Sequence, residues 1–246
     1  MISYIEKSIA CGGSLAGKTH RNMPKNNQDC FLIKKSSIGT LLCVCDGVGS
    51  NQFSAFGSRA ACKAVLKVFK LYYRKRITKE LVGATIEHYY QHYVRKKYRT
   101  AAGTTCLFCF IYEDAEVLIG QAGDGMILIR LDDKLFTFLD HEKSFVNEVY
   151  PLNCNYSYKA WKIKNLRFIP EQHKQLDILL ATDGVSDDVI PDKREDFLNH
   201  IIATAQRCGN AGVKDILKTW DAPGSIDDKT VTIFSWRRGN ELFSKG

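Results

Sequence analysis

Short apolar runs come first along the chain, and longer segments of helical spacing follow them. Residues 30–34 and 40–45 are two apolar runs joined by Ser36-Ser37-Ile38-Gly39, which predicts a pair of strands. Residues 54–73 have apolar positions at helical spacing, and the predicted stripe consists of Ala61, Val65, Val68 and Tyr72. A second helix is predicted over residues 79–97, with an inward face of Val82, Ile86, Tyr89 or Tyr90, and Tyr93.

Strand-like runs resume after these two helices. They cover residues 104–112, 116–121, 126–131, 134–138, 161–168, 176–181 and 229–236, and helical spacing returns at 193–206 and 211–219. Strand pairs and helix pairs segregate instead of alternating one by one. This order predicts antiparallel sheets with helices packed outside them, an α+β layered fold.

Length and composition favour one soluble domain. The 246 residues are compatible with one large or two small domains, but only 5 are Pro and no Gly/Ser-rich linker or repeat divides them. We therefore expect a single domain over residues 1–246. No apolar run approaches the length of a membrane span, and residues 1–6 lack the layout of a signal peptide. The expectation is a cytoplasmic protein without a membrane partner.

The cysteines fit a reducing compartment. The chain has nine of them, and five lie inside apolar strand runs: Cys30, Cys43, Cys45, Cys106 and Cys109. An odd count in core-like settings predicts reduced, buried thiols. Cys106 and Cys109 match the C-x-x-C spacing, but positions i and i+3 of a strand point to opposite faces. We therefore do not expect these two thiols to share a metal.

Positive charge is concentrated in one region. The chain carries a net charge of +8, and the stretch from Lys63 to Arg99 holds eleven Lys or Arg against Glu80 and Glu87. A nucleic-acid surface is one interpretation, but no nucleic-acid motif accompanies the charge, so solvated basic helix faces are favoured. Such a surface would also suit an acidic or phosphorylated protein partner. His88 and His92 have helical i, i+4 spacing, but their cationic surroundings argue against zinc.

The candidate chemistry lies in five acidic positions. Each stands beside a glycine or at the end of an apolar run: Asp29, Asp46, Asp124, Asp183 and the pair Asp227-Asp228. Carboxylates at strand ends, far apart in sequence, converge only if their strands are neighbours in a sheet. Converged hard oxygen ligands bind hard divalent cations such as magnesium or manganese. A single Asp-Gly pair is common in turns, so the prediction of a metal site rests on the combination of all five acidic positions.

Six motifs containing these residues resemble the metal-dependent type 2C Ser/Thr protein phosphatases, the PPM family, in the family's order. They are Asn-Gln-Asp at 27–29, Asp-Gly-Val-Gly-Ser at 46–50, Gly-Thr-Thr at 103–105, Ala-Gly-Asp-Gly at 122–125, Thr-Asp-Gly-Val-Ser-Asp at 182–187 and Asp-Asp-Lys-Thr-Val at 227–231. Thr19-His20 ahead of the first motif is most similar to a prokaryotic branch, whose members are often found beside kinases. The resemblance implies a four-layer α-β-β-α sandwich of two antiparallel sheets flanked by helices.

The resemblance also implies the activity and the ligands. It implies a phosphoprotein (Ser/Thr) phosphatase that uses two Mn²⁺ or Mg²⁺ ions, with a third in some members, and a water activated between them. Asp46 would bridge the ions, Asp29 would lie beside them, and the Gly47 carbonyl would complete the shell. Asp183 and Asp227 would bind from the other side, with Asp227 chosen over Asp228. Asp124 and Asp187 match the positions of the additional metal.

Two positions depart from animal-type members of the family. Val48 replaces a histidine that is also absent from many bacterial members, and Pro24 stands where an arginine grips the phosphate. Proline offers neither a charge nor an N–H. Nearby candidates for this role are Lys18, His20, Arg21 and Lys25, with His20 and Arg21 ranked equal and Lys25 below them. The sequence leaves two alternatives open: a pseudophosphatase that binds phosphoproteins or a kinase without turnover, and, more distantly, a nucleic-acid-binding module.

Overall fold

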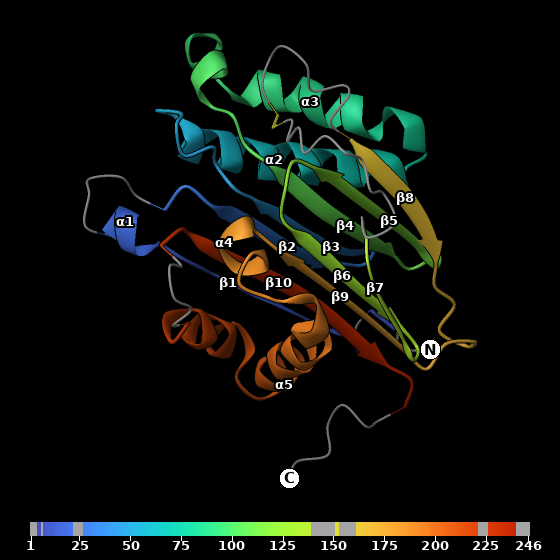
Figure 1. Cartoon of the computed structure of the whole chain (residues 1–246). Helices are drawn as coiled ribbons and strands as arrows, with labels where there is room; N and C mark the ends of the chain where they lie inside the picture. The colour runs from blue at the N-terminus through green and yellow to red at the C-terminus, as the bar shows by residue number, and fades with distance from the viewer. Residues whose placement is uncertain are drawn as a thin grey trace.

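Two five-stranded antiparallel sheets lie face to face between helical layers (Figure 1). The computed structural model describes residues 4–5, 7–21, 27–138, 151–152, 161–220 and 226–239. One sheet has the order β1-β10-β9-β6-β7, and the other has the order β2-β3-β4-β5-β8. The first consists of β1 (Ile9–Leu15), β10 (Lys229–Arg237), β9 (Gln175–Ala181), β6 (Met126–Leu131) and β7 (Lys134–Thr137). The second consists of β2 (Cys30–Ser36), β3 (Gly39–Cys45), β4 (Cys106–Tyr112), β5 (Glu116–Ala122) and β8 (Lys162–Arg167).

Each sheet is covered by helices on its outer face. The helices α2 (Ser54–Tyr73) and α3 (Val82–Tyr93) pack on the β2-to-β8 sheet, and α5 (Arg194–Lys218) packs on β1 and β10 of the other sheet (Figure 1). Three apolar clusters fill the spaces between these four layers. The middle cluster lies between the sheets and contains Leu107, Ile127, Ile178 and Phe234, all fully buried. The layers give the α-β-β-α sandwich that the motifs implied.

Strand register brings the acidic motifs to one edge of the sandwich. In the β2–β3 pair, Cys30 is opposite Cys45, so Asp29 and Asp46 lie one position beyond the paired strand ends. In the other sheet, Ala181 is opposite both Val231 and Met126. Asp183 begins the short helix α4 (Asp183–Ser186) directly after β9, and Asp227 precedes β10. The short helix α1 (Lys18–Arg21) lies toward the same edge (Figure 1).

Most predicted elements are confirmed. Helix α2 spans residues 54–73 as expected, and its stripe of Ala61, Val65, Val68 and Tyr72 is buried. The strands differ from their predicted bounds by one or two residues at the ends. The predicted helices 193–206 and 211–219 form one segment, α5, which is broken at Gly209, where a backbone φ of 57° interrupts the helical geometry.

Two predictions about elements are wrong, and one strand was not predicted. The second helix ends at Tyr93 and not at residue 97, because Val94 is extended, and a separate 3₁₀ segment covers Lys96–Ala101. Tyr93 does not face inward and is 40% exposed, whereas Val82, Ile86 and Tyr90 are buried. Strand β1 was not predicted, because Ile9–Leu15 reads IACGGSL and lacks a clear alternation of apolar and polar residues. None of the helices in the described ranges has the length and apolar character needed to cross a bilayer.

Candidate metal centre

Asp46 is fixed at its backbone by the Gly-Thr-Thr motif. The Thr105 N–H donates to the Asp46 carbonyl at 2.7 Å, and the Asp46 N–H donates to Thr105 Oγ1 at 2.9 Å. The hydroxyl of Thr104 donates to the same carbonyl at 2.8 Å. These three hydrogen bonds tie the end of β3 to the start of β4. They give the motif at residues 103–105 a physical purpose, which is to hold the Asp46 side chain in one place.

Asp29 is buried and is oriented from the opposite sheet. Its Oδ2 accepts hydrogen bonds from Thr182 Oγ1 at 2.9 Å and from Thr230 Oγ1 at 2.7 Å. Its Oδ1 is buried and has no hydrogen-bond donor among the described residues. Sequence reasoning quoted Thr182 and Thr230 in the motifs but assigned them no role. Only the packing of the two sheets shows that both hydroxyls point at Asp29.

Burial and neighbouring carboxylates raise the pKa values of Asp46, Asp29 and Asp183. Burial and the nearby Asp29, Asp183 and Asp227 raise the pKa of Asp46 to about 11. Burial raises the pKa of Asp29 to about 7, although the threonine hydroxyls oppose the shift. Burial, Asp124 and Asp227 raise the pKa of Asp183 to about 6. Carboxylates held this close are stable as anions only with a compensating positive charge.

This donor set fits divalent cations. It consists of hard carboxylate oxygens, which suit magnesium and manganese, and one of these oxygens is buried without a donor. Asp29, Asp46, Asp183 and Asp227 come from four separate strand ends, and Asp29, Asp183 and Asp227 lie close enough to Asp46 to raise its pKa. The convergence expected from the sequence is therefore present in the fold.

The two neighbouring acids at 227 and 228 have different surroundings. Asp228 is buried, and its carboxylate accepts the Gly17 N–H at 2.7 Å and the Gln28 N–H at 2.6 Å. Asp227 is exposed and is one of the groups that raise the pKa of Asp46 and Asp183. Asp228 thus anchors two backbone segments beside the site, and Asp227 faces the carboxylate cluster. This difference supports Asp227 as the ligand of the pair.

Asp124 and Asp187 lie next to each other at the rim. Both side chains are exposed, and burial, Asp187 and Asp227 raise the pKa of Asp124. Asp187 is thus close enough to Asp124 to raise its pKa, as a shared additional cation would require. Because both side chains are exposed, water can hydrate their charges. We therefore expect Asp124 and Asp187 to bind a cation more weakly than the carboxylate cluster does.

Gly47 and Gly184 are required by close packing. A Cβ at Gly47 would lie 2.8 Å from the Gln28 carbonyl oxygen and from Ser54, and a Cβ at Gly184 would lie 2.0 Å from the Asp228 carbonyl oxygen. Both contacts are with backbone atoms that cannot rotate away. The glycines after Asp46 and Asp183 therefore let neighbouring strand ends approach one another at the site.

His20 lies at the edge of the carboxylate cluster. Its Nδ1 is 2.9 Å from Asp228 Oδ2, and potential ligand atoms of His20, Asp227 and Asp228 lie within 4.8 Å of one another. The side chain of Arg21 and all of Pro24 and Lys25 lie outside the described residues. Of the four candidates for phosphate binding, the structure describes the side chains of Lys18, which is exposed, and of His20. The Nδ1 of His20 is directed to a structural carboxylate.

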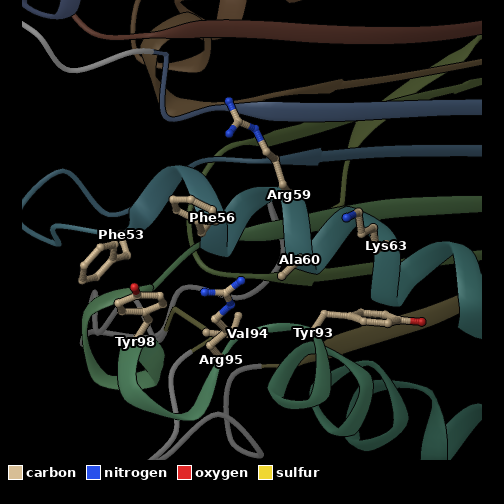
Figure 2. A pocket seen from close by; sticks show the side chains of 9 residues that line it. All are labelled: Phe53, Phe56, Arg59, Ala60, Lys63, Tyr93, Val94, Arg95 and Tyr98. Carbon is tan, nitrogen blue, oxygen red and sulfur yellow. The ribbon is translucent and has the colours of Figure 1, made fainter.

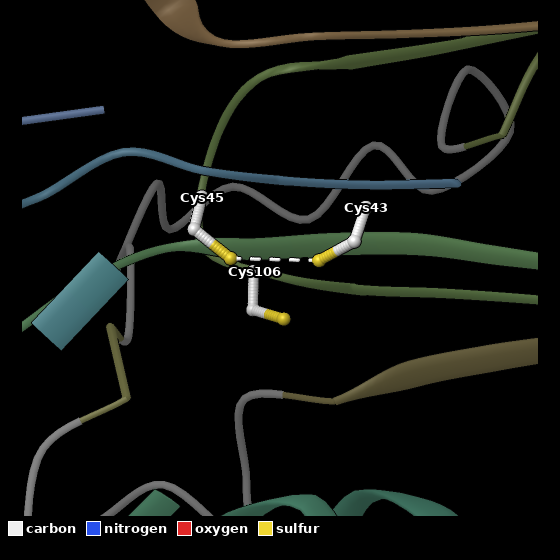
Figure 3. A group of neighbouring side chains, drawn as sticks. All are labelled: Cys43, Cys45 and Cys106. Carbon is white, nitrogen blue, oxygen red and sulfur yellow. Dashed lines mark hydrogen bonds between the residues drawn. The ribbon is translucent and has the colours of Figure 1, made fainter. Parts of the chain in front are cut away.

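A buried cluster of thiols lies on the helix side of the β2-to-β8 sheet. Cys43 and Cys45 are 3.6 Å apart at their Sγ atoms, and Cys62 of α2 lies 3.9 and 3.7 Å from them. Cys106 joins the same group (Figure 3). Cys109 points instead into the space between the sheets, as the strand argument predicted. All eight cysteines among the described residues are free, and Cys208 is exposed, contrary to the expectation of general burial.

His88 and His92 do not form a metal site with a third residue. Both side chains are exposed on α3, and among the residues with described positions no Cys, His, Asp or Glu completes a three-ligand group with them.

Comparison with known proteins identifies the family. A family model described as Protein phosphatase 2C matches residues 16–220, and the chain belongs to this family. A search of curated proteins gives no match.

Solved structures with the same fold include three proteins of low sequence identity to this chain. PppA, described as a regulatory component of T6SS in Pseudomonas aeruginosa, is 16% identical with a TM-score of 0.66, over 94% of this chain and 98% of that one. RsbX in complex with magnesium is 16% identical with a TM-score of 0.59, over 93% and 95%. The catalytic domain of the Ser/Thr phosphatase PstP with two manganese ions is 15% identical with a TM-score of 0.57, over 92% and 97%.

Proposed function

We propose that this chain is a metal-dependent Ser/Thr phosphoprotein phosphatase. The observation that carries the proposal is the carboxylate cluster at four strand ends, in which burial together with Asp29, Asp183 and Asp227 raises the pKa of Asp46 to about 11. Two neighbours of the same fold are described with magnesium or with two manganese ions. Family membership and the donor chemistry both support a pair of divalent cations here.

The residues have distinct tasks in this proposal. Asp46, whose pKa is raised by the other three aspartates, would bridge the two cations, while Asp29, Asp183, Asp227 and the Gly47 carbonyl would complete their binding. Thr182 and Thr230 hold Asp29 Oδ2, which leaves the buried Oδ1 available as a ligand. Cations bound there would supply a nucleophilic water at neutral pH and neutralise charge on the phosphoryl oxygens. Asp124 and Asp187 would bind a third cation.

Phosphate recognition is assigned to the segment before β2. His20, Arg21 and Lys25 are the proposed donors to the phosphoryl oxygens, since Pro24 cannot serve. The substrate would be a phosphorylated protein, and a kinase encoded nearby is the proposed functional partner. A cytoplasmic location is part of the same proposal.

A phosphatase assay tests the proposal directly. We expect hydrolysis of a small aryl phosphate and of phosphothreonine peptides with manganese or magnesium, and no hydrolysis after chelation. Asp46→Asn and Asp183→Asn should each lower kcat by at least about a hundredfold, because a lost ligand weakens the cations and raises the pKa of the water between them. Asp133→Asn, in the exposed turn between β6 and β7, is the matched control.

Two outcomes would contradict the proposal. Turnover that survives exhaustive metal removal would exclude the metal mechanism. Phosphopeptide binding without any turnover, at saturating manganese, would identify a pseudophosphatase.

A further inference from the structure

A pocket of about 520 Å³ lies between α2 and the segment that follows α3 (Figure 2). Phe53, Phe56 and Tyr98 form an aromatic group at one end, with ring centroids 4.0 Å apart for Phe53 and Tyr98 and 6.4 Å apart for Phe56 and Tyr98. Tyr93 lies toward the other end (Figure 2). Phe56 is 60% exposed and Tyr93 is 40% exposed, so large apolar surfaces face water here.

Three of the five remaining lining residues are cationic, and the other two are Ala60 and Val94. Arg59 and Lys63 stand one turn apart on α2, and Arg95 extends from the opposite wall (Figure 2). No carboxylate is among the lining residues that the structure describes. Lys97 lies 4.7 Å above the Tyr98 ring at the rim, and Lys97 and Arg95 lower the pKa of the Tyr98 hydroxyl. The pocket therefore combines an aromatic surface with a positive potential.

The same turns of α2 support the carboxylate cluster from their other side. Ser54, the first residue of α2, packs on Gly47, which follows Asp46. Ser58 Oγ donates to the Gln28 carbonyl at 2.6 Å, one residue before Asp29. Arg59 follows Ser58 and lines the pocket. The first two turns of α2 thus lie between the pocket and the backbone that carries Asp29 and Asp46.

We propose that this pocket binds an acidic segment of the phosphoprotein substrate, with an aromatic or aliphatic side chain against Phe53, Phe56 and Tyr98. Carboxylates that flank this side chain would pair with Arg59, Lys63 and Arg95. The proposal rests on the proposed phosphatase function and adds the substrate class. It gives a function to the pocket, in which basic side chains from α2 and from the α3–β4 connection surround exposed aromatic rings.

A peptide fits the pocket better than a nucleic acid does. Sequence-tolerant binding of single strands needs aromatic faces that are open to stacking bases. The Tyr98 ring already packs against Phe53 and has Lys97 over its face. A concave pocket with mixed aromatic and cationic walls instead matches one apolar side chain between acidic neighbours.

A binding measurement tests this pocket independently of turnover. The probe is a fluorescent, unphosphorylated peptide of Glu residues around one Phe, and its control has Lys in place of Glu. We expect the Glu peptide to bind wild-type protein and the Lys peptide not to bind. The double variant Arg59→Glu/Lys63→Glu should weaken binding at least about tenfold, because it replaces two attractive charges with repulsive ones. Phe56→Ala should weaken binding while leaving the charge unchanged.

A matched double variant on the far side of the molecule controls for net charge. Arg207→Glu/Lys214→Glu makes the same charge change on exposed positions of α5 and should leave peptide affinity unchanged. Equal weakening by both double variants, or equal affinity for the Glu and Lys peptides, would overturn the proposal. A single-stranded oligonucleotide that displaces the Glu peptide and itself loses binding in Arg59→Glu/Lys63→Glu would assign the pocket to nucleic acid.

Kinetics separate this proposal from the proposed function. Arg59→Glu/Lys63→Glu should raise KM for an acidic phosphothreonine peptide and leave the turnover of a small aryl phosphate unchanged, since the latter cannot reach the pocket. Hydrolysis of both substrates with an unchanged peptide KM would refute the docking site alone. Absence of all hydrolysis in wild type would refute the phosphatase function, while the binding result would still decide the pocket.

Discussion

Asp46→Asn should stabilise the metal-free protein. In the absence of cations, burial and three neighbouring aspartates raise the pKa of Asp46 from 3.8 to about 11. At pH 7 the folded protein must therefore keep this side chain protonated, although it would ionise in the unfolded chain. The interval from 3.8 to pH 7 is about 3.2 units, and at about 1.4 kcal/mol per unit the penalty is about 4 kcal/mol. Asparagine is neutral at every pH, so Asp46→Asn removes this penalty.

The pH dependence has a definite sign. A carboxyl with a raised pKa binds its proton more tightly in the folded state, so stability falls as the pH rises from the unfolded pKa toward the folded pKa. At pH 5 the interval above 3.8 is about 1.2 units, which reduces the expected gain to about 1.6 kcal/mol. The advantage of the variant should therefore grow between pH 5 and pH 7.

Thermal melting with and without manganese measures this effect. For a chain of this size, about 4 kcal/mol corresponds to a rise in Tm of roughly 10 °C for the metal-free variant at pH 7. Saturating manganese should reverse the order, because ligand binding stabilises only the folded state and the wild type binds the ions more tightly. Asp133→Asn should change neither Tm. A metal-free Asp46→Asn protein that melts at or below metal-free wild type would refute the assignment of Asp46 to the centre of the cluster.

Three further predictions concern groups around this centre. Asp228→Asn should lower the free energy of unfolding in urea by about 3 kcal/mol, because one of the two backbone N–H groups that it binds would face an amide donor; a change within about 0.5 kcal/mol would contradict its anchoring role. Replacing the side chain that donates hydrogen bonds to the substrate phosphate with Ala should raise KM and preserve manganese affinity. If His20→Ala, Arg21→Ala and Lys25→Ala all have unchanged KM and kcat, the phosphate is bound by the cations alone or by a residue outside this segment. A water-soluble thiol reagent should modify exposed Cys208 quickly and the buried cysteines only as fast as the protein opens; rapid modification of Cys43, Cys45, Cys62, Cys106 or Cys109 would contradict their burial.

Several features of this protein were determined by the sequence itself. Helix α2 follows from the spacing of apolar residues at 61, 65, 68 and 72, and the buried strands follow from apolar runs. Asp29, Asp46 and Asp183 stand next to strands whose bounds are readable, so their position at strand ends was also predictable. Helical periodicity and turn formation depend on residues only a few positions apart, so a single sequence is enough to predict these elements.

Other features were decided only by the tertiary structure. Strand β1 has a weak pattern and is held by pairing with β10, more than 200 residues away in sequence. Tyr93 has helical spacing but is exposed, because the chain turns away at Val94. The hydroxyls of Thr182 and Thr230 reach Asp29 only because the two sheets pack together. The different tasks of Asp227 and Asp228 depend on backbone N–H groups from two distant segments. These properties depend on contacts between distant segments, and such contacts exist only once the layers have assembled.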